Sequence, residues 1–178
     1  MGLYLIESSL KEIVSTKAEL DQKAEVLQTE LKEKNSALIE LQVSKDFSRA
    51  FFIVEAEEPN AATDTLKTVG IPVQLVKEVR LVGKELEEIK KNKDVVNYLV
   101  EWNIPENITM DAYLARKKKN SVHYQEVPEV SFSRTYVCED MTKCLCFYDA
   151  PDEAAVKRAR EAVQTPIDSI TEILTTNE

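Results

Sequence analysis

An internal repeat constrains this chain's fold more than any other feature, because the second half restates the first at a fixed offset. Shifting the sequence by 94 residues aligns like residues without a gap. The aligned pairs include Tyr4 with Tyr98, Leu5 with Leu99, Glu7 with Glu101, Asp46 with Asp140, Ala56 with Ala150 and Pro72 with Pro166. The constant offset and the shared hydrophobic rhythm predict two homologous units, at residues 1–82 and 95–178. The charged segment between them, residues 83–94, predicts a solvated linker of helix or loop.

Each half shows the same order of local patterns: an apolar β-rich segment, a helix, two alternating runs, a second amphipathic helix and a last strand. The first helix follows the capping-box signature Thr16-x-x-Glu19 in the first half and starts at Thr109 in the second. We expect the strands of the first half at residues 3–8, 38–43, 49–55 and 73–81, and those of the second at 95–102, 131–138, 143–149 and 167–174. The second helices are expected to start near Pro59 and after Asp152. The order βαββαβ is that of a ferredoxin-like unit, so the sequence predicts an α+β fold built from two such units in tandem.

Composition excludes several classes of partner and location. Twenty-three Lys and Arg residues against 32 Asp and Glu residues give a net charge of −9, which repels phosphate backbones, so we expect no nucleic-acid partner. No apolar run is long enough to span a bilayer, and the N-terminus lacks the basic region of a signal peptide, so we expect no membrane partner. Three cysteines crowded at Cys138, Cys144 and Cys146 are no disulfide framework. They fit a reducing compartment, and we expect a cytoplasmic protein.

The second half carries a more specific string of residues. It reads Asp140-x-x-Lys143-x-x-Cys146, then Ala150-Pro151, Ala155-Val156, Arg158, Pro166-x-Asp168 and Glu172-Ile173. With this string it resembles a family of small bacterial ferredoxin-like proteins, long labelled a domain of unknown function, of which one studied type is a homodimeric nickel-binding protein. The first half is less similar but keeps Asp46, Ala56 and Gly70-x-Pro72. The resemblance implies a tandem fusion whose halves pair as a pseudo-dimeric α+β barrel, with further self-association left open.

Nickel is the cofactor that this resemblance implies. The family's histidines are expected on the first strand and on the helices, where this chain has Trp102, Asn103, Lys117 and Arg160. Imidazole is the natural ligand of that ion, and His123 is the chain's one histidine. His123 is therefore the candidate metal ligand, with a plain surface histidine as the alternative. We expect nickel, if it binds at all, to bind weakly.

The positions of the three cysteines favour a packing role over a chemical role. Cys144 and Cys146 are two residues apart in a predicted strand, so they share one face, while Cys138 lies on the other. Their mates in the first half are Ala50 and Phe52. We therefore expect Cys144 and Cys146 to be reduced and buried, with a redox or soft-metal role as the alternative.

The other face of the predicted hairpins mixes charge with large apolar groups, as the lining of a small-molecule cavity does. It presents Glu40 from the first half and Arg134 and Tyr136 from the second. Glu7 and Glu101 stand at the ends of the first strands, where a repeated carboxylate suits a proton acceptor or a ligand group. These five residues are the candidate ligand site. The alternatives are strand-end glutamates in solvent, or a salt bridge from Arg134.

Two function classes remain, because the sequence has no Gly-rich phosphate loop, no Gly-x-Ser-x-Gly elbow and no pair of histidines. The first is a cytoplasmic protein that binds a metal or small ligand for sequestration or stress response, without catalysis. The second is a cofactor-free enzyme of the dimeric α+β barrel kind, a monooxygenase or an isomerase. The basic run from Arg116 to Lys119 predicts a solvated helix face more than an anion site.

Overall fold

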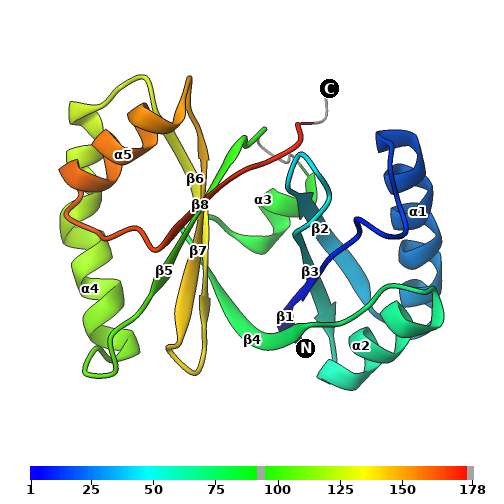
Figure 1. The fold of residues 1–178 in the computed structure, drawn as a ribbon. Helices are drawn as coiled ribbons and strands as arrows, with labels where there is room; N and C mark the ends of the chain where they lie inside the picture. The colour runs from blue at the N-terminus through cyan, green and yellow to red at the C-terminus, as the bar shows by residue number, and fades with distance from the viewer. Residues whose placement is uncertain (92–94, 176–178) are drawn as a thin grey trace. The chain divides into compact units, whose positions relative to one another are not determined.

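The structure, a computed structural model, describes residues 1–91 and 95–175, and its chain divides into two compact units. The first unit ends at Val79 and the second begins at Arg80. Within the described residues both units combine helices with an antiparallel sheet, so the predicted α+β class is confirmed. The two units are described separately below and are drawn together in Figure 1.

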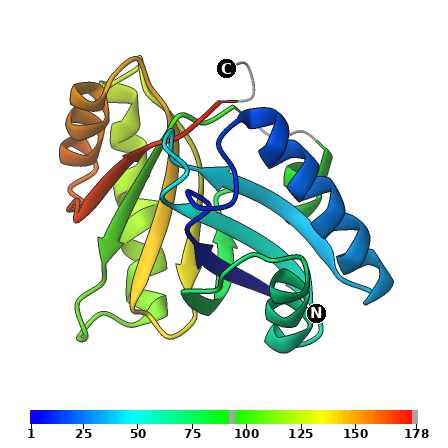
Figure 2. The ribbon, with the colours of Figure 1, turned by 45° about the vertical axis from the view of Figure 1, so that its right-hand side comes forward.

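The first unit has four strands and two helices among its described residues. They are β1 (Gly2–Ser8), α1 (Lys17–Glu33), β2 (Ala37–Val43), β3 (Ala50–Ala56), α2 (Pro59–Thr68) and β4 (Leu75–Val82), the last of which runs past the unit boundary. The strands lie in the order β2-β3-β1-β4, and every pairing is antiparallel. Helices α1 and α2 cover one face of this sheet (Figure 2). Burial of the apolar side chains of β1 and β3 therefore holds the unit together.

Local signals explain where these elements begin and end. Thr16 is the N-cap of α1, and its side chain accepts a hydrogen bond from the backbone N–H of Glu19 at 3.2 Å, as the capping box predicts. After α2 the chain turns at Gly70, whose φ of +83° suits a residue without a Cβ. The β2–β3 turn is held by Asp46, whose Oδ1 accepts from the backbone N–H of Ser48 at 2.9 Å.

The second unit repeats this order of elements. After α3 (Leu86–Lys91) come β5 (Tyr98–Asn103), α4 (Met110–Asn120), a 3-10 helix η1 (Ser121–Glu126), β6 (Ser131–Cys138), β7 (Lys143–Asp149), α5 (Glu153–Ala162) and β8 (Ser169–Glu172). The strands lie in the order β6-β7-β5-β8, again all antiparallel in their described pairings. Helices α4 and α5 cover one face of the sheet (Figure 1). Between sheet and helices lies a core that includes Trp102, Tyr113, Cys146, Tyr148 and Val156.

Irregular backbone features fall 94 residues apart in the two units. Phe47 and Met141 each take a φ of +63° in the hairpin turn. Each β2–β3 or β6–β7 ladder shifts register at the same place, between Leu38 and Glu40 and between Phe132 and Arg134. Helices α2 and α5 also start and end at residues 94 apart. Each of these features therefore recurs at the same offset of 94 residues as the sequence repeat.

Some predicted boundaries differ from the structure. The strand expected from Val95 begins only at Tyr98, and the one expected over residues 167–174 is the four-residue β8. The linker contains α3, whose Ile89 is fully buried, so the expected solvation holds only for its charged side chains. Burial of the apolar Ile89 side chain stabilises the fold. The charged residues on either side of Ile89 hide this apolar position in the sequence. Residues 92–94 of the linker lie outside the described residues.

Candidate functional site

The five candidate ligand residues are divided between the units, and most of them are buried. Glu7 and Glu40 lie in the first unit, and Glu101, Arg134 and Tyr136 lie in the second. Glu7 and Glu101 are 9% and 7% exposed, so the alternative of strand-end glutamates in solvent is wrong. Burial of carboxylates requires charged or hydrogen-bonding partners.

Partners for these residues are present within each unit. Arg49 Nη2 donates to Glu7 Oε1 at 3.0 Å, and Lys143 Nζ lies 3.8 Å from Glu101 Oε2. Glu40 Oε1 accepts from the amide of Gln42 at 2.9 Å. These pairs give each carboxylate a structural role beside the predicted one.

Arg134 and Tyr136 come together on the face of the second sheet that α4 and α5 do not cover. The guanidinium of Arg134 stacks 5.4 Å from the ring centre of Phe147 and donates to Ser133 Oγ at 2.6 Å. The ring of Tyr136 meets the same Phe147 edge-on, with centroids 6.1 Å apart. Both residues are fully buried. Their role in ligand binding stays a prediction.

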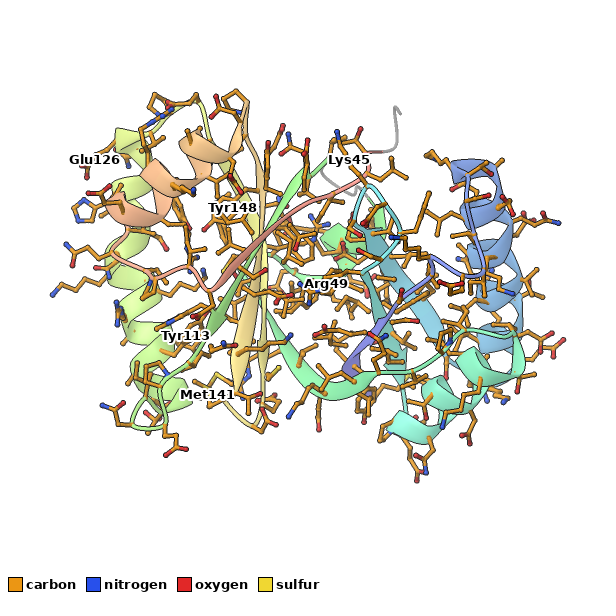
Figure 3. All side chains as sticks on the ribbon, viewed as in Figure 1. Lys45, Arg49, Tyr113, Glu126, Met141 and Tyr148 are labelled. Carbon is orange, nitrogen blue, oxygen red and sulfur yellow. The ribbon has the colours of Figure 1, made fainter. Side chains whose placement is uncertain are left out.

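His123 lies at the surface of the second unit, on η1. Its side chain is 44% exposed, and its Nδ1 lies 2.5 Å from Glu126 Oε2. Figure 3 shows Glu126 on the outer side of the helical layer. In the described part of the chain, no group of three or more His, Cys, Asp or Glu side chains is placed to hold a metal ion. The described residues therefore do not fit a nickel centre, which usually recruits three or four such ligands.

A pocket that sequence reasoning did not predict opens in the second unit, between the sheet and the helices α4, η1 and α5. Its lining residues are Trp102, Tyr113, Arg116, Lys117, Asn120, Ser121, Tyr124, Cys146, Arg160, Val163 and Thr165. About 20 Å³ is open to the centre of a water molecule, which is room for one or two waters. Among the described residues that line the pocket, three carry a positive charge and none is acidic.

Arg160 forms the buried wall of this pocket. It is 2% exposed, and α5 carries it on the same apolar stripe as Val156, four residues earlier. Its Nη1 donates to the Tyr148 hydroxyl at 3.1 Å, and its Nη2 donates to the Pro166 carbonyl at 2.6 Å. Its Nε has no hydrogen-bond partner in the structure. Burial opposes the charge, but the neighbouring Cys146 sulfur and Tyr148 oxygen outweigh this and raise the pKa of Arg160.

Tyr148 and Tyr124 extend the hydrogen-bond network that begins at the Arg160 guanidinium. The hydroxyls of Tyr124 and Tyr148 lie 2.6 Å apart, and Figure 3 shows Tyr148 and Tyr113 within the layer between sheet and helices. Burial raises the pKa of Tyr148 to about 12, and it raises the pKa values of Tyr113 and Tyr124 as well. All three phenols are therefore neutral at physiological pH.

One thiol, that of Cys146, lines the pocket from the sheet side, and Cys144 is its neighbour on the same strand. Cys144 and Cys146 are free and buried, as the sequence predicts. The Thr135 hydroxyl lies 3.3 Å from Cys146 Sγ and donates to it. The hydrogen bond from Cys144, with the charges of Lys117 and Arg160, holds the pKa of Cys146 well below its ordinary value, despite burial. Cys146 is thus the thiol that ionises first.

The basic run of α4 is mostly the solvated face that the sequence predicts, because Arg116, Lys118 and Lys119 are exposed and Lys117 is half-buried. Two of its residues, Arg116 and Lys117, also line the pocket. The guanidinium of Arg116 lies 5.4 Å from the Trp102 ring centre, and Lys117 Nζ lies 4.4 Å from that of Phe132. Cation–π contacts of this kind orient the two side chains over the core.

The pocket lies in the part of the chain that a family model recognises. Residues 98–173 match the model described as "Nickel responsive protein SCO4226-like". The resemblance expected from the sequence is confirmed for this segment. No curated protein sequence matches the chain. None of the described helices has the length and apolar character needed to cross a membrane.

Solved structures share the chain's ferredoxin-like α+β fold. One is described as "Putative Chlorite dismutase TA0507", with a TM-score of 0.55 and 11% identity over 98% of this chain and 95% of that chain. Another is a "putative monooxygenase" from Lactobacillus acidophilus NCFM, with a TM-score of 0.50 and 13% identity over 98% and 94%. At such identities the likeness shows the fold alone, so it gives the enzyme alternative no added support.

Proposed function

We propose that this protein binds a small ligand in the pocket of its second unit, without catalysis, in a sequestration or stress-related role. The observation that carries this proposal is the pocket itself, with its buried Arg160, half-buried Lys117 and low-pKa Cys146. Concave sites with a few convergent polar groups are where proteins bind small molecules. Three lining residues of the pocket also stand at positions where the resemblance expects the family's histidines. They are Trp102, Lys117 and Arg160.

A thermal-shift panel tests this proposal. The probes are nickel chloride, sodium phosphate, sodium sulfate, sodium acetate and glycine, each with the native protein, Lys117→Gln and Lys118→Gln. Lys118 is the matched control, since it carries the same charge on the same helix but does not line the pocket. At least one probe should raise the melting temperature of the native protein and of Lys118→Gln more than that of Lys117→Gln. If every probe acts equally on all three proteins, the pocket is not the binding site.

Nickel itself is expected to bind weakly and without a dedicated site. His123 has one nearby carboxylate, Glu126, and a single imidazole with one carboxylate is too few ligands for tight binding. Titration calorimetry with nickel on the native protein and on His123→Ala decides the matter. Submicromolar binding that the substitution abolishes would contradict the expectation and restore His123 as a metal ligand.

The tandem organisation is part of the proposal. The two units, residues 1–82 and 95–178 in the sequence, are proposed as copies of one ferredoxin-like domain that pair as a pseudo-dimeric α+β barrel. The shared element order and the irregularities 94 residues apart support common ancestry. An experimental structure tests the pairing: a pseudo-twofold axis between the sheets is expected, and units that share no interface would refute it. Glu7, Glu40, Glu101, Arg134 and Tyr136 are the residues that such an interface would present to a ligand.

A cytoplasmic location is also proposed, with no nucleic-acid partner. It is supported by three free cysteines in the described chain, which an oxidising compartment would tend to pair or modify. Fractionation of cells that produce the protein, with detection by a specific antibody, checks this. Recovery from a secreted fraction would contradict it.

A further inference from the structure

We infer that the pocket of the second unit is an anion site, which admits one or two oxygen atoms of a small oxyanion or of a carboxylate group between Arg160, Lys117 and Arg116. This inference rests on the proposed function, because it names the ligand class of the same pocket. It departs from the expectation that the basic run of α4 is only a solvated face.

A buried guanidinium needs a negative charge near it. Removing an arginine from water is unfavourable unless a counter-charge and hydrogen bonds replace the lost hydration. The hydrogen bonds of Arg160 go to the hydroxyl of Tyr148 and to the carbonyl of Pro166. Neither acceptor carries a charge at neutral pH, since the pKa of Tyr148 is about 12. The protein thus supplies acceptors to Arg160, but neither of them is a carboxylate.

Ionisation of Cys146, whose pKa the Cys144 hydrogen bond and nearby cations lower, would supply part of the missing charge. The Cys146 sulfur lies in the same pocket and is held by the hydroxyl of Thr135 at 3.3 Å. One thiolate balances one cation, however, and the pocket is lined by Arg160, Lys117 and Arg116. An excess of positive charge remains even when Cys146 is ionised. On a chain with a net charge of −9, three cations in a pocket with no acidic residue among its described lining are a local reversal of sign.

The donors in the pocket suit an oxygen anion. Arg160 Nε has an N–H group without a partner, and it is buried in the wall of a pocket that has room for one or two water-sized atoms. Lys117 is half-buried beside it, with its ammonium over the ring of Phe132. Charge-assisted hydrogen bonds from guanidinium and ammonium groups to an oxyanion are among the strongest in proteins. The aromatic side chains of Trp102 and Tyr113 line the same pocket and lower its polarity, which strengthens the attraction.

The same charge explains why a bare divalent cation does not fit this pocket. Nickel ions would meet Lys117 and Arg160 at positions where the family resemblance expects imidazoles. A metal that travels as an oxyanion, such as molybdate, meets no such repulsion. An anion site therefore accommodates the family's metal-related role as readily as it accommodates a metabolite carboxylate.

The test uses Trp102, the chain's one tryptophan, as a reporter inside the pocket. The native protein is titrated with sodium sulfate, phosphate, molybdate and acetate at constant ionic strength, which sodium chloride maintains. Binding is followed by Trp102 fluorescence and by calorimetry. Lys117→Gln and Arg160→Lys are measured in parallel, with Lys118→Gln as the matched control. Arg160→Lys keeps the buried charge and so guards against loss of folding, which far-ultraviolet circular dichroism checks.

A saturable response to at least one oxyanion is expected, and it should be weakened about tenfold in Lys117→Gln and unchanged in Lys118→Gln. Molybdate alone would indicate a metal oxyanion, and acetate alone a carboxylate ligand. No saturable response to any of the four salts would overturn the inference, as would an equal loss in Lys118→Gln. If only nickel shifts the melting temperature through Lys117, the anion class is wrong while the proposed function stands. If no probe acts through Lys117, both fail.

Discussion

Removing single hydroxyls from the tyrosine network above Arg160 tests its geometry. The Tyr124 and Tyr148 hydroxyls lie 2.6 Å apart, and Tyr148 also accepts from Arg160 Nη1 at 3.1 Å. Tyr124→Phe removes one neutral hydrogen bond and leaves Tyr148 with its arginine partner, so it should cost about 1 kcal/mol of unfolding free energy. Tyr148→Phe removes both bonds and leaves a buried charged donor and the Tyr124 hydroxyl unpaired. Its cost should be about 3 kcal/mol.

Urea unfolding followed by Trp102 fluorescence measures these costs, because the reporter lies in the same unit as the network. The double variant completes a cycle. Adding Tyr124→Phe to Tyr148→Phe should cost about 0 kcal/mol, since the bond that it removes is already lost. Equal costs for the two single variants, or additive costs in the double variant, would refute the network as described. A greater loss in Tyr124→Phe would place the arginine contact on the other hydroxyl.

Two further outcomes are expected, one from turn geometry and one from tyrosine ionisation. Gly70→Ala should destabilise the first unit by about 1 kcal/mol, because the φ of Gly70 is +83°. Gln164→Gly should stabilise the second unit by about 0.5–1 kcal/mol, because Gln164 has a φ of +55° at the equivalent turn. Thermal unfolding of both variants checks the opposite signs, and two changes of like sign would refute the equivalence. The free energy of unfolding should also fall as pH rises from about 10 to 12. Burial raises the pKa of Tyr148 from 10.0 to about 12, so the folded state binds the phenol proton of Tyr148 more tightly than the unfolded state does. Urea midpoints across this range measure the decline, and a flat profile would contradict it.

The fold was largely predictable because its signals are local. The alternating runs around Asp46 and Asp140 are hairpin signals, and the structure gives β6 and β7 the predicted bounds. Thr16 and Thr109 cap α1 and α4, as their positions before helical patterns predict. Each signal involves residues close in sequence, so one chain was enough to detect it. Strand ends such as that of β8 depend on pairing partners and were less accurate.

The pocket could not be predicted in the same way, because its residues come from five separate elements. In the sequence Lys117 is one of four consecutive basic residues, and only the fold shows that it lines the pocket with Tyr113, four residues earlier on α4. The sequence does hold one signal of the pocket: Arg160 falls on the apolar stripe of α5, between Val156 and Val163. A charged residue at a core position is a candidate functional residue, because burying an unpaired charge costs free energy.

The repeat itself indicates which unit acquired the pocket. At positions 94 residues earlier, Cys146, Tyr148 and Arg160 correspond to Phe52, Val54 and Leu66. These three apolar residues are buried in the first unit, at 0–1% exposure, and need no counter-charge or hydrogen bond. Keeping polar groups at the same positions of the second unit lowers stability, because each has to be desolvated. The polar network of the second unit therefore lowers stability, which agrees with the binding role proposed for the pocket, and the family match falls on that unit, at residues 98–173.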